Sequence, residues 1–327
     1  MDHLGLVAGM YDELNIGENI DRSIKQNPNC RNLSIGTLCK ALVINGLGFA
    51  GRTLYMVDMF FDGKPVESLL GPGITPSQLN DSVLGRALDD IQRYGTTELY
   101  SELVPSICHQ LGLDPKFAHT DSTDFNLDGR YNSDNPPEPD SSVLHLTRGY
   151  SRDHRPDLNQ VVLNLITDNE AGIALHMEAL SGNTSDKAAF RDTVRQHIAN
   201  LQNVTGFSCL VMDSAGYTAG TISSFTQGQK WISRVPETLS ECKKLVQSTA
   251  VLTPIDDKHS YRVVQSHYAE VEQRWLLVRS EDACKREMKT LVKNTLSGSQ
   301  KEVKLFEKLC HQTFSCEADA ASGVSII

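Results

Sequence analysis

The sequence predicts an α/β fold in which a mixed sheet is flanked by helices and preceded by a helical region. The first 110 residues carry apolar side chains at helical spacing. Residues 159–180 hold two β-rich runs separated by the turn sequence D-N-E-A-G, which indicates an antiparallel hairpin. Helical and strand patterns then alternate up to residue 235. This order is typical of a hairpin sheet to which later strands are added in parallel through crossover helices.

Residues 1–110 form the predicted helical N-terminal domain. Ser34 is placed to cap one helix, and Asn80 precedes a second helix that Gly95 is placed to end. A third helical pattern covers about 97–110. We expect the leucines of these helices to share one core, formed by Leu38, Leu42, Leu84, Leu88 and Leu103.

Residues 111–236 form the second predicted domain, which contains the sheet. Its elements are a strand at Phe117–Leu127, the hairpin, a helix opened by Ser185, and an apolar strand that ends at Asp213. A short helix and another strand follow. The order strand, hairpin pair, helix, strand, helix, strand is that of a ribonuclease-H-like domain. Residues 237–327 add two strand candidates and a long charged helix, and we treat them as a third domain.

Composition and charge narrow the class of protein. The 327 residues carry a net charge of −10, so a broad cationic surface for nucleic acid is not predicted, whereas carboxylates that hold a divalent metal are compatible with the total. The sequence has no run of 18 apolar residues and no signal peptide, so we expect a cytoplasmic protein with no membrane partner. Eight scattered cysteines without a C-x-x-C pair argue against a disulfide framework and a zinc site of the usual spacing.

Two aspartates are the candidate catalytic and metal-binding residues. Asp121 lies in the strand sequence H-T-D-S-T, and Asp213 ends an apolar strand at the edge where α/β sheets place their ligand sites. Each also has an ordinary explanation, as a solvated residue near a strand end or as a helix cap. If the two strands are neighbours, the paired carboxylates need a cation, and Mg²⁺ keeps positions open for phosphate oxygens.

Two further segments carry polar side chains. The run R-G-Y-S-R-D-H-R precedes a strand, and its side chains Arg148, Arg152, His154 and Arg155 suit contact with a DNA backbone, although a solvated basic loop has the same composition. The run L-S-G-N-T-S-D-K at 180–187 is interpreted as a strand-to-helix turn with a capping residue.

Taken together and in order, these motifs resemble a known family. H-T-D-S-T, R-G-Y-S-R-D-H-R-P-D-L-N-Q, L-S-G-N-T-S-D-K and V-M-D-S-A-G resemble the catalytic core of bacterial insertion-sequence transposases of the DDE type, and the N-terminal text K-A-L-V-I-N-G-L-G-F resembles the preceding helical domain. The resemblance implies a ribonuclease-H-like core with Asp121 and Asp213 as two acids that bind Mg²⁺ or Mn²⁺. It also implies DNA cleavage and strand transfer at the ends of a mobile element, by a protein that is a homo-oligomer at full length.

The sequence departs from the family at the third acid. The family pattern is Y-x-x-R-x-x-x-E followed seven residues later by Lys, and no Glu after residue 213 has this spacing. Glu272 has similar neighbours at the wrong spacing, and the segment from Arg274 to Glu281 resembles the β-rich insertion that precedes the acid. We therefore interpret residues 237–327 as a partial insertion domain of a chain truncated at its C-terminus, and we expect it to be inactive alone.

Two other functions remain open at this stage. One is a non-catalytic DNA-binding or regulatory fragment of a transposase that retains the N-terminal domain. The other is a ribonuclease-H-like nuclease that uses Asp121, Asp213 and a local acid such as Asp124. The position of a third carboxylate discriminates between them, because a nuclease needs one within reach of the metal.

Overall fold

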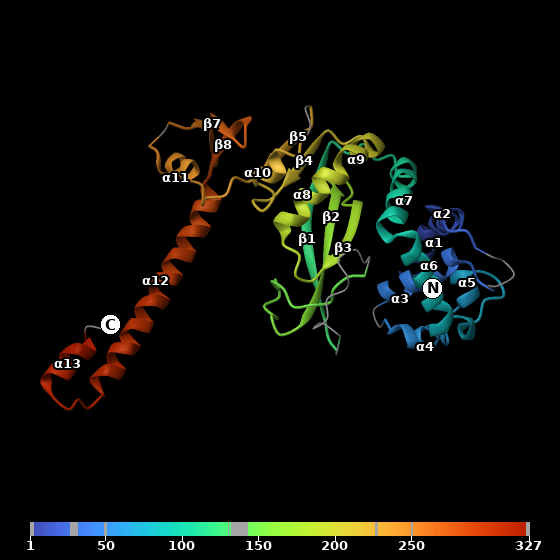
Figure 1. Ribbon diagram of the computed structural model, residues 1–327, viewed down its shortest axis with the longest axis horizontal. Helices are drawn as coiled ribbons and strands as arrows, with labels where there is room; N and C mark the ends of the chain where they lie inside the picture. Colours follow the sequence, from blue (N-terminus) through green and yellow to red (C-terminus); the bar gives the residue numbers. More distant parts are fainter. Residues whose placement is uncertain are drawn as a thin grey trace. The chain divides into compact units, whose positions relative to one another are not determined.

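The computed structural model describes residues 3–26, 32–48, 51–129, 131, 143–225, 228–249 and 251–324. The chain divides into two compact units, Met1–Pro236 and Glu237–Ile327. The first unit contains a helical region and a five-stranded sheet, and the second contains a three-stranded sheet and a long helix (Figure 1). The predicted fold class is confirmed: a mixed sheet is flanked by helices, and a helical region precedes it.

The helical region begins at the N-terminus and ends at the helix that leads into the sheet. Its elements are α1 (His3–Glu13), α2 (Ile16–Ser23), α3 (Ile35–Leu47), η1 (Leu54–Met56), α4 (Val57–Phe61), α5 (Val66–Leu70), η2 (Pro76–Gln78), α6 (Asp81–Tyr94) and α7 (Thr96–Gln110). The predicted caps are confirmed, because Ser34 Oγ accepts the Thr37 N–H at 3.1 Å and Asn80 Oδ1 accepts the Val83 N–H at 3.1 Å. Gly95 ends α6 at a φ of 107°.

One hydrophobic core holds this region together. It includes Leu38, Leu84 and Leu103, and the half-buried Leu42 packs against it. The prediction for Leu88 is wrong, because this side chain is 42% exposed. The face of α6 that packs on the core runs along Val83, Leu84, Ala87, Ile91 and Tyr94. Leu88 lies about 90° around the helix from the centre of that face, so it points past the core.

The five-stranded sheet has the order β3-β2-β1-β4-β5. Its strands are β1 (Phe117–Leu127), β2 (Asn159–Asp168), β3 (Ala174–Ser181), β4 (Cys209–Met212) and β5 (Lys230–Ser233). The first three strands are antiparallel neighbours, and β4 and β5 are added in parallel, with β4 paired directly to β1. This is the ribonuclease-H-like arrangement that the element order predicted.

The two faces of this sheet differ. Helices α7, α8 (Asp186–Gln196) and α9 (Ile198–Thr205) cover one face, where Ala118, Ile166 and Leu210 are buried. A short helix, α10 (Ala219–Ile222), lies between β4 and β5 in the sequence. Strand residues alternate between the faces, so β2 has a buried residue at every second position. The other face carries half-buried residues of β2, such as Leu165.

The hairpin between β2 and β3 is fixed by one buried carboxylate. Asp168 is 3% exposed and accepts hydrogen bonds from the backbone N–H groups of Glu170, Ala171 and Ile173 at 2.6 to 2.7 Å. Burial by itself raises the pKa of this carboxyl, but the backbone donors outweigh it and hold the pKa below the ordinary value of 3.8. The side chain therefore replaces the missing hydrogen bonds of the turn.

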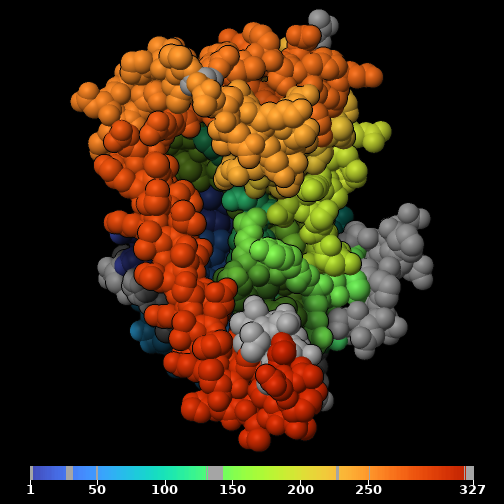
Figure 2. Space-filling view, turned by 90° about the vertical axis from the view of Figure 1, so that its left-hand side faces the viewer, coloured from blue at the N-terminus to red at the C-terminus, as the bar shows by residue number. Residues whose placement is uncertain are grey.

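The second unit consists of β6 (Thr253–Pro254), β7 (His259–Tyr268) and β8 (Val271–Ser280) in one sheet, with helices α11 (Ser240–Gln247), α12 (Glu281–Cys310) and α13 (Glu317–Val324). Helix α12 is 30 residues long and has no buried residue. Figure 2 shows it in orange-red as a column whose side chains are exposed along its length. Within the described ranges, no helix combines the length and the apolar character needed to cross a membrane.

The core of the helical region gives a matched pair of substitutions on one helix. We expect Leu84→Ala to lower the free energy of unfolding by about 3 kcal/mol, because the side chain is fully buried and leaves a cavity. Leu88→Ala, four residues along α6, should cost about 0.5 kcal/mol or less because that side chain is already hydrated. Urea denaturation measures both, and equal losses would contradict this packing.

The hairpin carboxylate gives a prediction about pH. Asp168→Asn should lower the free energy of unfolding by about 1–3 kcal/mol at neutral pH, because three hydrogen bonds to a charged acceptor are weakened. The native pKa lies below the unfolded one, so this contribution is present above about pH 4 and is lost as the pH falls through the native pKa. The gap between wild type and variant should therefore close in acid. Asp192→Asn, an exposed control, should show no such convergence.

Candidate functional site

The pairing of β1 with β4 places the two predicted aspartates side by side along the sheet. The last paired residues of these parallel strands are His119 and Val211. Asp121 and Asp213 each lie two residues further on, so the register continued past the end of β4 sets them opposite each other. Parallel partners point to the same face, and both aspartates are exposed. Asp121 therefore lies on β1, and Asp213 directly follows β4, the parallel neighbour of β1.

Each of these carboxylates is oriented through one of its oxygens. Asp121 Oδ1 accepts the N–H of Ser122 at 2.8 Å, and Asp213 Oδ1 accepts the N–H of Ala215 at 2.8 Å. The Ser233 hydroxyl donates to the Asp213 carbonyl at 2.8 Å, which ties the end of β4 to β5. In the described part of the chain, no hydrogen bond involves the Oδ2 atom of Asp121 or of Asp213, so each carboxylate keeps an oxygen that can bind a cation.

Two glycines seat the R-G-Y-S-R segment against the sheet. A Cβ atom on Gly149 would lie 2.1 Å from the Gly182 carbonyl oxygen, and one on Gly182 would lie 2.1 Å from the Gln160 carbonyl oxygen. The backbones therefore approach more closely than any other residue would allow. A bridge between Thr147 and Gln160 and a hydrogen bond from Gly182 N–H to the His145 carbonyl fix the same contact. The glycines of these two separate motifs are therefore both required by the same close backbone contact.

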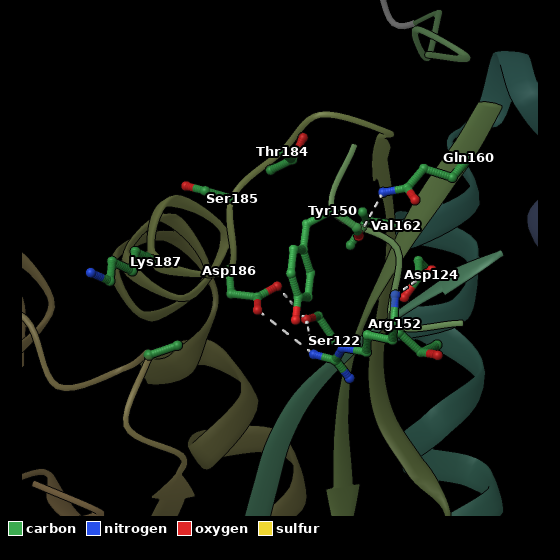
Figure 3. Close-up of a pocket in the computed structure, with 12 residues that line it drawn as sticks. Ser122, Asp124, Tyr150, Arg152, Gln160, Val162, Thr184, Ser185, Asp186 and Lys187 are labelled. Atoms are coloured by element: carbon green, nitrogen blue, oxygen red, sulfur yellow. Dashed lines mark hydrogen bonds and ion pairs between the residues drawn. The ribbon is translucent and has the colours of Figure 1, made fainter. Parts of the chain in front are cut away.

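Arg152 leads from this segment to the carboxylates. Its Nη2 atom lies 3.4 Å from Asp121 Oδ1, 3.1 Å from Ser122 Oγ and 3.7 Å from Asp186 Oδ2. Ser122 Oγ in turn donates to Asp186 Oδ1 at 2.6 Å, and Figure 3 shows the guanidinium directed at Asp186. The Arg152 backbone N–H donates to Asp124 at 3.3 Å. One cation therefore joins an aspartate of β1 to an aspartate at the start of α8.

A cavity of about 270 Å³ adjoins this network. Residues from each of the four motifs line it: Ser122, Tyr150, Arg152, Asp186 and Ala215. Figure 3 shows the Tyr150 ring beside Arg152, whereas Lys187 points away from it. Segments that are up to 93 residues apart in the sequence, from Ser122 to Ala215, thus meet at one hollow next to the paired aspartates.

The other predicted DNA-contact residues lie on the same segment but outside this network. Arg155 binds Asp157 with Nε and Nη2 at 2.9 and 2.8 Å, and this pairing raises the pKa of Arg155 and lowers that of Asp157. His154, the residue before Arg155, adopts a φ of 57°. Arg148, His154 and Arg155 are all exposed, so their side chains are accessible to a large ligand.

The structure adds two residues that the sequence interpretation passed over. Asp186 was assigned only to a capping turn, and Ser185 does cap α8 by accepting the Ala188 N–H at 3.3 Å. The aspartate after the cap also binds Ser122 and Arg152, which only the docking of α8 against β1 reveals. Tyr150 is 85% exposed at the rim of the cavity. An exposed aromatic ring between basic residues was the available signal for it.

The alternative acid Asp124 does not join the pair. It lies three residues after Asp121 on β1, so the alternation of the strand directs it to the opposite face. Among the described residues, the one group of three His, Cys, Asp or Glu side chains with ligand atoms within 4.8 Å of one another contains neither Asp121 nor Asp213. Glu272 lies on β8 in the second unit.

Three comparisons with known proteins complete the description. Residues 1–105 match a family model described as a domain of unknown function, DUF4277. No curated protein matches the chain. Among solved structures, a chain of a Mos1 transposase paired-end complex with left transposon end is similar, with 12% sequence identity, coverage of 59% of this chain and 70% of that chain, and a TM-score of 0.24.

Proposed function

We propose that this chain is a DDE-type transposase of a bacterial insertion sequence, which cleaves and transfers DNA strands at the ends of its element. The observation that carries the proposal is the register of β1 and β4, which sets Asp121 opposite Asp213 on one exposed face of a ribonuclease-H-like sheet. The order and wording of the four sequence motifs around the cavity support it.

The donor set at this face fits a hard divalent cation. Asp121 and Asp213 present oxygen atoms only, and each is held through Oδ1 with the second oxygen available. Oxygen ligands in this number suit Mg²⁺ or Mn²⁺, which retain open positions for phosphate oxygens. A bound pair of such ions supplies stabilisation of the attacking and leaving oxygens of a phosphodiester.

Arg152 is the residue that we assign to the DNA backbone closest to the reacting group. In this structure its guanidinium neutralises Asp121 and Asp186, as an incoming cation would. Cation binding at Asp121 would release the guanidinium for a phosphate, for which its planar fork is suited. Tyr150 at the cavity rim offers a ring on which an unpaired base can stack.

Two alternatives rank below this proposal. A stand-alone nuclease needs a third carboxylate near the pair, and Asp124 points to the other face of β1. A purely regulatory DNA-binding fragment needs no cation site, so it gives no reason for the two aspartates to face the same side. With two identified acids, we expect slow cleavage by these residues alone, because reacting groups misplaced by about 1 Å can cost about 100-fold in rate.

The cation site gives the first test of the proposal. Asp121→Asn and Asp213→Asn should each weaken Mn²⁺ binding about tenfold, a loss of about 1.4 kcal/mol, because a neutral amide replaces a charged ligand. Electron paramagnetic resonance of free Mn²⁺ measures the affinity directly. The matched control is Asp157→Asn, an exposed aspartate that is paired with Arg155 instead.

Two outcomes would contradict parts of this prediction. If Asp157→Asn weakens Mn²⁺ binding as much as the other two, the ions bind diffusely and the proposed site does not exist.

Cleavage gives a second measurement: a supercoiled plasmid that carries the element ends should show little cleavage by this chain with Mg²⁺ or Mn²⁺. Robust cleavage that depends on Asp121 would show that another residue supplies the third acid.

Arg152 gives a separate test of the DNA contact. We expect Arg152→Gln to weaken binding to a duplex with the element's terminal sequence and to reduce the slope of log K against log salt by about 1, as the loss of one phosphate contact requires. Stability should change by less than about 1 kcal/mol, since all of its ion-pair partners are exposed. Fluorescence anisotropy at several salt concentrations measures the slope.

The control for this test is Arg93→Gln on α6. Arg93 is also exposed and also pairs with an aspartate, Asp90, but it lies in the helical region. We expect its substitution to leave the salt slope unchanged. Equal slopes for Arg152→Gln and wild type would show that Arg152 only joins the carboxylates and does not contact DNA.

A further inference from the structure

A cluster of three side chains lies on the opposite face of the sheet from the paired aspartates. His176 and Glu178 project from β3, two residues apart, and His197 occupies the junction between α8 and α9. One ligand atom of each lies within 4.8 Å of the other two, and His176 Nε2 is 3.9 Å from Glu178 Oε2. The two imidazole rings face each other with centroids 4.7 Å apart.

The environment of His176 is the unusual part of this cluster. The side chain is 1% exposed, and its Nε2 atom has no hydrogen-bond partner among the described residues. A buried polar atom without a partner is rare in folded proteins and needs an explanation, such as an ion. This Nε2 atom lies 3.9 Å from Glu178 Oε2, which is too long for a hydrogen bond. Packing of two histidines by itself does not account for an orphaned nitrogen beside a carboxylate.

We propose that His176, Glu178 and His197 bind a transition-metal ion of the zinc class, with a fourth position left for water or another ligand. Two imidazoles and one carboxylate form a known three-ligand set for Zn²⁺, whereas Mg²⁺ prefers oxygen ligands alone. Tetrahedral ligand atoms around Zn²⁺ are about 3.3 Å apart. Separations of up to 4.8 Å therefore close by relative movements of at most about 1.5 Å. The site uses no cysteine and is separate from the proposed Mg²⁺ site.

The surrounding charges are compatible with this ligand set. Burial lowers the pKa of His197, and the neighbouring His176 adds to this, while Glu178 and Glu98 oppose it. Glu98 on α7 is close enough for its charge to act on His197.

A metal at this position would act as a structural tie. It would join the edge strand β3 to the α8–α9 junction, two elements that are otherwise linked through apolar packing around Leu175 and Ile198. Helix α8 begins at Asp186, the residue that binds Arg152 across the sheet edge. The tie would therefore hold the helix whose first residue lines the cavity beside Asp121.

The test uses Co²⁺, which reports tetrahedral coordination by its visible absorption. The full chain, stripped with a chelator and returned to metal-free buffer, should bind one Co²⁺ with intense visible bands that Zn²⁺ abolishes. His197→Gln should weaken Co²⁺ binding on the order of 100-fold or more, because losing a directly bound ligand costs more than the 10–100-fold typical of losing a group that hydrogen-bonds to a ligand. His109→Gln, an exposed histidine in the last turn of α7, is the matched control and should bind as wild type.

A second variant guards against misfolding. Glu178→Cys replaces one ligand by another, so it should retain Co²⁺ binding and gain a thiolate-to-cobalt charge-transfer band in the near ultraviolet. Asp121→Asn should leave the Co²⁺ spectrum unchanged, which separates this site from the proposed Mg²⁺ site. The proposal is overturned if wild type gives only octahedral Co²⁺ spectra, or if folded Glu178→Cys binds Co²⁺ without the charge-transfer band.

Discussion

The parallel pairing of β1 with β4 is the constraint on which the candidate site depends. Only three residue pairs join these strands, because β4 is four residues long and ends at Met212. β1 continues for several residues beyond its partner, held on its other side by β2. Asp121 thus gains access to solvent from a central strand, and Asp213 follows the last residue of β4.

The chain as a whole is acidic, so the negative charge of the aspartates at this edge is balanced by a nearby arginine and not by a general excess of cations. Asp121 and Asp186 come from different elements and share the single guanidinium of Arg152. Their exposure makes these ion pairs weak, so they can be broken at little cost in free energy.

Much of the fold could be predicted from the sequence because it rests on local signals. The caps at Ser34 and Asn80 and the hairpin at Asp168 each depend on residues within a few positions of one another. The errors concern contacts between distant segments. Leu88 follows the helical spacing of Leu84 but points past the core, and the ties of Asp186 arise only when α8 docks on β1. Helical periodicity identifies the apolar face of a helix, but it does not show how far the elements packed against that face extend.

The contrast between local signals and contacts of distant segments also explains why the aspartates on one face of the sheet could be predicted and the histidines on the other could not. Asp121 and Asp213 stand at strand positions whose chemistry is evident in the sequence, and register alone brings them together. His176 and His197 are 21 residues apart, on a strand and at a helix junction, with no recognisable ligand spacing. Their approach depends on how α8 and α9 pack against β3, so only the folded arrangement reveals the unpartnered Nε2 atom of His176 and the histidine ring beside it. A sheet with helices on one face can thus present open carboxylates on one side and enclose imidazoles on the other.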